Sequence, residues 1–241
     1  MTEWLDPTLL LLGVVVALGA TVQSTIGFGI SVVAAPFVVL LRPDLMPASL
    51  LVCVFALPLM QLATGARTIA WRHLGWALGA RALVTPVGVL LVAATSADVI
   101  ALTVGILILV TVLASVTTLD IQLTRRNSAA AGAITGVSGT AAAIGGPFFA
   151  IVLQHERPER LRATLAVFFL AGTVIAFTGL SLAGQVDATD VRAGLLWVPF
   201  VLLGHVLAGP LRSRIAAQTV RRGVLAFCVI ASVSVIGRAV I

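Results

Sequence analysis

Two stretches of small and polar residues interrupt a chain that is otherwise almost entirely apolar. The first holds Gln23, Ser24, Thr25, Gly27, Phe28 and Gly29, and the second holds Ser138, Gly139, Thr140, Gly145, Gly146 and Pro147. In a bilayer core, an unpaired backbone group costs several kcal/mol, so a helix breaks there only where protein or a water-filled cavity satisfies the freed N–H and C=O groups. Two such breaks predict a binding site.

The chemistry of the breaks favours an anion. Pro147 suits the first turn of a helix, where its missing N–H would have no partner, so we expect a half-helix to begin there, with Gly29 in the corresponding place. Two half-helix N-termini that meet at mid-membrane would offer N–H groups to a small oxyanion without a fixed cation. Hydroxyls and the Gln23 amide would add donors. Alternatively, glycines only allow helices to pack closely, which is our interpretation of Gly132 and Gly172.

Two ionisable side chains lie inside apolar runs, Arg81 in 74–94 and His205 in 193–210. A charge within a membrane indicates function by default. Arg81 either lies in the substrate path or extends its side chain to the nearer membrane face. His205 is either a proton relay or substrate donor, or a neutral histidine paired within the bundle.

The composition predicts an all-α polytopic membrane protein. Of 241 residues, 60% are hydrophobic and 10% are charged, with a mean hydropathy of +1.15. This length suits one transmembrane domain over 1–241. Glu3 and Asp6 precede the first apolar run without a cation, unlike a secretory signal peptide. We expect Cys53 and Cys228 to be core residues, and we expect no metal, cofactor or nucleic acid as partner.

Apolar runs divide the chain into candidate helices, at about 8–22, 30–41, 47–64, 74–94, 99–119, 128–144, 147–155, 160–183, 193–210 and 223–241. A helix needs about 20 residues to span the hydrocarbon layer, so we expect the runs beside the two breaks to be too short. Each broken pair is therefore either one interrupted crossing or a re-entrant hairpin.

Loop arginines favour the hairpins, because short cytoplasmic loops carry an excess of arginine. Eight crossings would divide them 8 against 6, whereas six crossings with two hairpins divide them 11 against 3. The second arrangement leaves only Arg42, Arg192 and Arg238 on the arginine-poor face, together with both termini. We therefore predict six crossings, two hairpins and both termini outside.

The two halves resemble each other at an offset of roughly 120 residues. In each half, a broken helix pair precedes three helices, which predicts a first repeat over 8–119 and a second over 128–241. An odd number of crossings per half would insert the second copy upside down, as in secondary transporters that bind substrate between inverted repeats. The alternative is the weak similarity shared by all apolar helices.

Taken together, these residues resemble the TauE/SafE sulfite exporter family over nearly the whole chain. The resemblance rests on the first glycine stretch with Pro36, on 68–72 before a glycine-rich helix, and on Gly145-Gly146-Pro147-Phe148 followed by 162–164 and 168–169. It implies a permease in the bacterial plasma membrane that commonly exports sulfite or organosulfonate anions. The expected partners are a small anion and the lipid bilayer, with a homodimer as a candidate assembly.

Two other functions compete with this one. Gly136-Val137-Ser138-Gly139 matches the GxSG pattern of rhomboid intramembrane proteases, for which His205 would be the base. The inverted repeat would then have no explanation. A membrane subunit that does not transport is the third hypothesis, and it predicts no stabilisation by anions.

Overall fold

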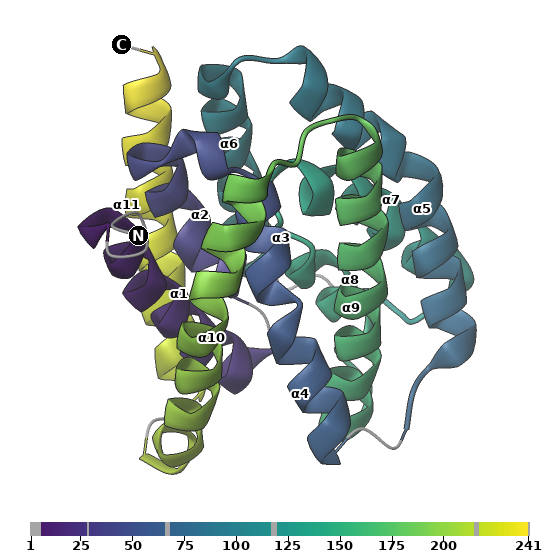
Figure 1. The fold of residues 1–241 in the computed structure, drawn as a ribbon. Coiled ribbons are helices and arrows are strands. Elements are labelled where there is room, and N and C mark those ends of the chain that lie inside the picture. The colour runs from purple at the N-terminus through teal and green to yellow at the C-terminus, as the bar shows by residue number, and fades with distance from the viewer. Residues whose placement is uncertain (1–5, 28, 66–67, 117–119, 215–216, 241) are drawn as a thin grey trace.

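The computed structural model describes residues 6–27, 29–65, 68–116, 120–214 and 217–240, which form helices and connecting segments without a β-strand (Figure 1). The predicted site residue Phe28 lies outside them. Within the described residues, five helices are long and apolar enough to cross a membrane, over 7–26, 71–94, 97–114, 158–182 and 188–211. An all-α polytopic membrane protein is confirmed.

The first broken pair consists of α1 (Pro7–Ile26) and α2 (Ile30–Leu41). The expectation that the first run is too short to span is wrong, because α1 has 20 residues. Its polar residues stay helical: the Thr21 and Thr25 hydroxyls donate to carbonyls four residues earlier, at 2.9 and 2.7 Å. The helix ends only at Gly27, whose φ of 96° is left-handed.

This pair is a hairpin that returns the chain to the end from which it entered. Arg42 follows α2 in the sequence, and its guanidinium lies 3.3 Å from the carboxylate of Asp6, the N-cap of α1. It also donates to Asp44 at 2.8 Å, in the short 3-10 helix Pro43–Leu45, and this hydrogen bond holds the pKa of the Asp44 carboxyl below its usual value.

The second broken pair, α7 (Arg125–Ala141) and α8 (Gly146–Val152), is closed in the same way. His155 follows α8, and its Nε2 lies 2.7 Å from the carboxylate of Asp120, which precedes α7. The neighbouring Gln154 amide donates to the Ile121 carbonyl at 3.4 Å. The two predicted hairpins are therefore confirmed as chain courses.

Six further passes complete the described bundle, by α3 (Ala48–Val54) with α4 (Ala56–Gly65), α5 (Trp71–Ala94), α6 (Ala97–Val116), α9 (Pro158–Leu182), α10 (Ala188–Arg214) and α11 (Ala217–Val240). The run 47–64, expected to form one helix, is divided at Phe55. Pro58 has no N–H to bond the Val54 carbonyl, which explains the position of the break.

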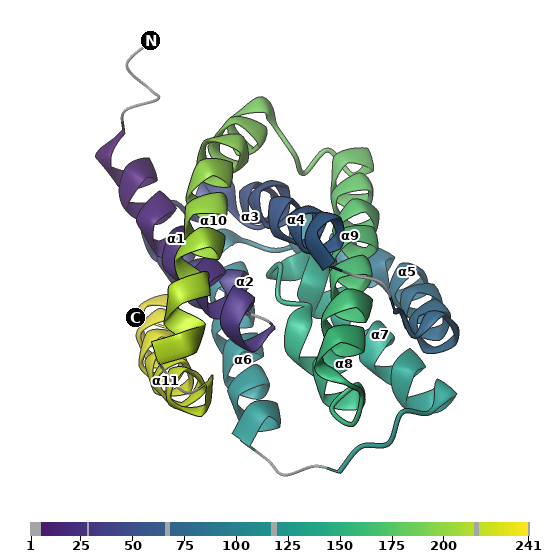
Figure 2. The same ribbon diagram turned by 90° about the horizontal axis from the view of Figure 1, so that it is seen from below.

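The two hairpins open toward opposite ends of the bundle. Arg238, at the end of α11, donates to the carbonyl of Leu40 at the open end of the first hairpin, at 3.1 Å. At the other end, the Ala70 N–H before α5 donates to Thr164 in the first turns of α9, at 3.0 Å. Because α9 directly follows the second hairpin, that hairpin opens here (Figures 1 and 2).

Glycines bring each hairpin against a long helix of the other half of the chain. A Cβ on Gly132 of α7 would overlap the Ala77 carbonyl of α5, and one on Gly204 of α10 would overlap the Ala17 carbonyl of α1. Backbones approach this closely only where side chains are absent. The close-packing interpretation of Gly132 is confirmed.

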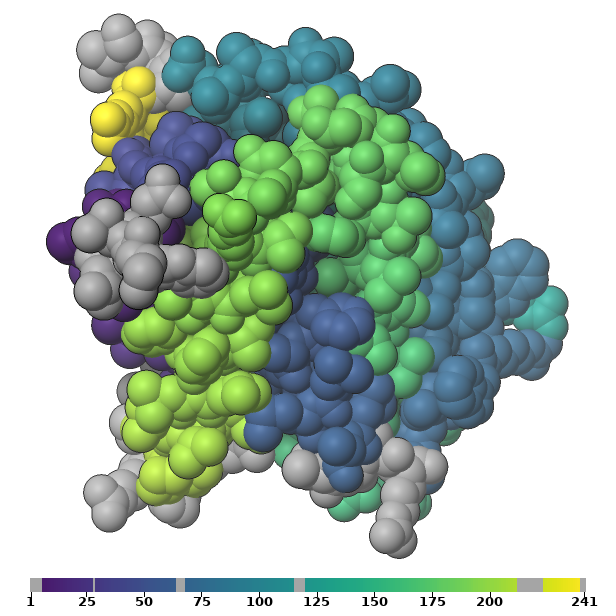
Figure 3. Space-filling model, viewed as in Figure 1, coloured from purple at the N-terminus to yellow at the C-terminus, as the bar shows by residue number. Residues whose placement is uncertain are grey.

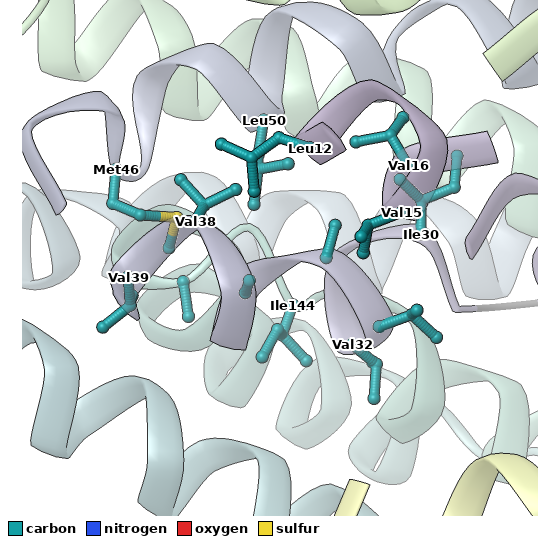
Figure 4. Close-up of a cluster of buried hydrophobic side chains, with 14 of the residues drawn as sticks. Leu12, Val15, Val16, Ile30, Val32, Val38, Val39, Met46, Leu50 and Ile144 are labelled. Carbon is teal, nitrogen blue, oxygen red and sulfur yellow. The ribbon is translucent and has the colours of Figure 1, made fainter. Parts of the chain in front are cut away.

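The largest apolar core surrounds the first hairpin and includes two buried residues of the second break, Ala142 and Ile144 (Figure 4). Ile144 is 1% exposed and packs in the same cluster as Leu12, Val16 and Ile30. The tip of the second hairpin therefore reaches the first.

Candidate functional site

A cavity of about 40 Å³ lies between the tips of the two hairpins. The cavity is lined by parts of α1, α2, α3, α5, α7, α8 and α9 and by the second break. The lining residues are Gln23, Gly29, Ser31, Val32, Leu51, Val54, Arg81, Gly139, Ala143, Ile144, Gly145, Gly146, Pro147, Phe169 and Thr173. A water molecule needs about 10–15 Å³ by this measure, so the cavity holds about three waters or a few heavy atoms of a ligand.

Arg81 supplies a fixed cation at this cavity. The residue is 2% exposed, so the hypothesis that it extends to the membrane face is wrong. Its guanidinium carbon lies 5.0 Å from the centre of the Phe168 ring, which favours a cation. Arginine keeps its charge in proteins, and no ion pair within the described residues includes Arg81.

Two nitrogens of this guanidinium, Nε and Nη1, are buried and have no hydrogen-bond partner in the described part of the chain. A buried donor without a partner costs about 1–3 kcal/mol, and more when it is charged. An anion that accepts these bonds would remove that cost. Of the two predicted arrangements, an anion site without a fixed cation and Arg81 in the substrate path, this geometry favours the second.

Three glycines from separate segments make room for the guanidinium. A Cβ on Gly139 of α7 would lie 2.8 Å from Nη2, and one on Gly145, which precedes α8, would lie 3.3 Å from Nη1. A Cβ on Gly172 of α9 would overlap Cζ. The close-packing interpretation of Gly172 therefore changes, because this glycine accommodates a charged side chain. We call Gly139, Gly145 and Gly172 the glycine cradle.

Gln23 has a different role at the cavity from the one predicted. Its side-chain oxygen accepts from the N–H groups of Gly29 and Ile30, at 3.2 and 3.0 Å, so it caps the N-terminus of α2. Those two N–H groups are therefore already bonded. The Gln23 NH₂ group remains as a donor at the cavity wall.

Neither helix N-terminus forms the predicted anion site unaided. α2 is capped by Gln23, and α8 has 7 residues, about two turns. Gly145, Gly146 and Pro147 do line the cavity, as does Gly29, whose φ of 149° requires glycine. Both breaks thus contribute backbone, while α5 contributes the charge.

Several predicted residues lie outside the cavity lining. Ser24 donates to or accepts from Nδ1 of His205 at 2.9 Å, a pair between α1 and α10. Of the two alternatives for His205, the geometry thus favours a histidine paired within the bundle. Thr25 and Thr140 bond carbonyls of their own helices, and Gly27 caps α1.

Ser138 is fully buried in α7, and its hydroxyl has no partner among the described residues. His205 is bonded to Ser24 and not to Ser138, so the serine–histidine dyad that a rhomboid-like protease requires is not formed. The protease hypothesis loses its geometric basis.

Sequence reasoning missed Ser31, Phe169 and Thr173 in the lining. Ser31 and Thr173 are each 7% exposed, and their hydroxyls add polar groups to the wall. Ser31 lies one residue into α2 and Thr173 next to Gly172, so their closeness to the breaks was the available signal.

Gly172→Ala should displace Arg81 and lower anion flux by about tenfold, because the added methyl overlaps the guanidinium and misplaces its hydrogen bonds. The end of a flexible side chain can move, so we expect the variant to fold. Flux into proteoliposomes measures the effect, and Gly79→Ala on α5, with open space around its Cβ, is the matched control. Equal flux in both variants would contradict this role of Gly172.

The comparisons with known proteins give one result. The family model for the sulfite exporter TauE/SafE matches residues 11–235, which is nearly the whole chain. No match was found among curated proteins or among solved structures. The matched segment contains both breaks, Arg81 and the glycine cradle, and this chain belongs to the TauE/SafE sulfite exporter family.

Proposed function

We propose that the protein is a permease that exports sulfite or a small organosulfonate, and that the anion binds beside Arg81 between the hairpin tips. The observation that carries this proposal is a buried guanidinium with two unpartnered nitrogens at the wall of a small cavity. A sulfur oxyanion offers acceptors in the directions of a guanidinium fork. The family's transport of sulfite supports the choice of anion.

Other groups of the lining would complete the recognition. The NH₂ group of Gln23 and the hydroxyls of Ser31 and Thr173 can donate to further oxygens of the anion. The glycines of the second break let the ligand approach the backbone. The small volume and the one cation of the described lining together favour a compact anion of low charge.

We also propose the inverted repeat, with boundaries at 8–119 and 128–241. The packing supports it: α1 packs on α10 of the second half, as α7 packs on α5 of the first, and α6 packs on α11. Each hairpin thus lies against the middle one of three passes from the opposite half. A cavity between such repeats is where secondary transporters bind substrate.

Anion binding should raise the melting temperature of the purified protein in lipid nanodiscs. A ligand that binds only the native state stabilises by RT ln(1 + [L]/Kd), which is about 2.7 kcal/mol at 100 times Kd. Sulfite, thiosulfate, sulfoacetate and taurine form the panel, with chloride at equal ionic strength as control. A subunit that does not transport predicts no response to any of them.

We place both termini outside the bacterial plasma membrane. Cysteines at Arg42 and Arg157, in a protein whose two native cysteines are replaced by serine, should then label from opposite sides of the membrane, with position 157 cytoplasmic. The hairpins that open toward opposite ends of the bundle support this expectation. Labelling of both positions by the same impermeant reagent would contradict it. The homodimer stays a prediction.

A further inference from the structure

A lateral groove of about 530 Å³ runs between α3 and α4 on one side and α9 and α10 on the other, where Figure 3 shows a hollow in this face of the bundle. Its lining is apolar apart from two threonines. The lining residues are Leu51, Val52, Phe55, Ala56, Leu59, Thr173, Val174, Phe177, Thr178, Val191, Leu195 and Val198. The volume is within the range of pockets for small molecules, about 300–1,000 Å³.

Two residues, Leu51 of α3 and Thr173 of α9, line both this groove and the cavity at Arg81. Three consecutive residues of α9 connect the two spaces. Gly172 accommodates the guanidinium, Thr173 lines both spaces, and Val174 lines the groove. An unpaired cation and an apolar groove therefore share one wall.

This arrangement matches a ligand with an anionic head and an unbranched apolar tail. The head would accept hydrogen bonds from Arg81, whose Nε and Nη1 have no partner among the described residues. The tail would pass the side chains of Leu51 and Thr173 and would transfer its own methylenes from water to the apolar lining. We propose that the protein binds alkanesulfonates, with the sulfonate beside Arg81 and the alkyl chain in the lateral groove.

This inference rests on the proposed anion site and extends it to a class of substrate or inhibitor. The test compares methanesulfonate with hexanesulfonate on the full protein in lipid nanodiscs, with the apparent Kd taken from the rise in melting temperature. Each buried methylene contributes up to about fourfold in affinity. We expect hexanesulfonate to bind at least about tenfold more tightly than methanesulfonate, and 1-hexanol to give no comparable stabilisation.

The groove is tested by a pair of tryptophan variants. Val174→Trp should fill the groove and abolish the gain from the longer chain while methanesulfonate still binds, because Val174 lines the groove and is 49% exposed. Leu83→Trp on α5 is the matched control, since Leu83 is 81% exposed and lies outside the groove lining. It should keep the full dependence on chain length.

Three results would overturn the inference. If hexanesulfonate binds no better than methanesulfonate, the groove takes no alkyl chain and the anion site alone stands. If 1-hexanol stabilises as strongly, and Val174→Trp removes that effect, the groove binds lipid chains without the head at Arg81. If methanesulfonate itself does not bind, the proposed function fails as well.

Discussion

Arg81→Gln should lower sulfite flux about 10- to 100-fold without unfolding the protein. A hydrogen bond to a charged group is worth about 1.5–3 kcal/mol, and glutamine at this position removes the charge together with the paired donors. Arg81 is fully enclosed, so no neighbouring cation among the described residues of the cavity lining can replace it. Initial rates in proteoliposomes measure the loss.

Two further variants separate binding from folding. Arg81→Lys keeps the charge but not the planar fork, so its flux should lie between those of the wild type and Arg81→Gln. Arg72→Gln, at the exposed start of α5, should keep full flux. Because Arg81 is a buried charge without a counterion among the described residues, Arg81→Gln should also keep or raise the melting temperature. A lower melting temperature with normal flux would assign Arg81 to structure alone.

Gly132→Ala should destabilise the protein by at least about 2 kcal/mol, the cost of overpacking a tight contact. The added methyl would overlap the backbone of Ala77, and backbone cannot move aside as the end of a side chain can. Helices α5 and α7 must therefore separate. Thermal unfolding in nanodiscs measures the change in stability.

The control for this substitution is Gly79→Ala, which lies on α5 near the same contact but has open space around its Cβ. Alanine is the better helix former, so this variant should be as stable as the wild type or slightly more stable. If Gly132→Ala matches Gly79→Ala in melting temperature, the close contact between α5 and α7 does not require glycine at position 132.

The course of the chain could be predicted from charges, whereas helix lengths could not. Loop arginines predicted both hairpins, because the positive-inside bias acts on the connecting segments and needs no knowledge of packing. The length of α1 was missed because Ser24 and Thr25 read as a break. In the folded chain the hydroxyl of Thr25 bonds within the helix and Ser24 bonds to His205, so the helix continues past both.

The sequence could not decide between the two alternatives for Arg81, because α5 is apolar on every side. Leu83 and Leu90 face outward while Leu74 and Val92 are buried, so hydrophobicity does not reveal which side of the helix faces inward. The role of Gln23 was missed for another reason. Its oxygen bonds N–H groups six and seven residues later, across a break whose geometry depends on Gly27 and Gly29.

The glycine cradle has a consequence for how sequences in this family can vary. A Cβ at any of three positions on separate segments, 139, 145 and 172, would crowd the same side chain, that of residue 81. Substitution at any of the three is therefore conditional on position 81. Relatives that keep an arginine there should keep all three glycines, whereas relatives with a small residue at position 81 should be free to change them together.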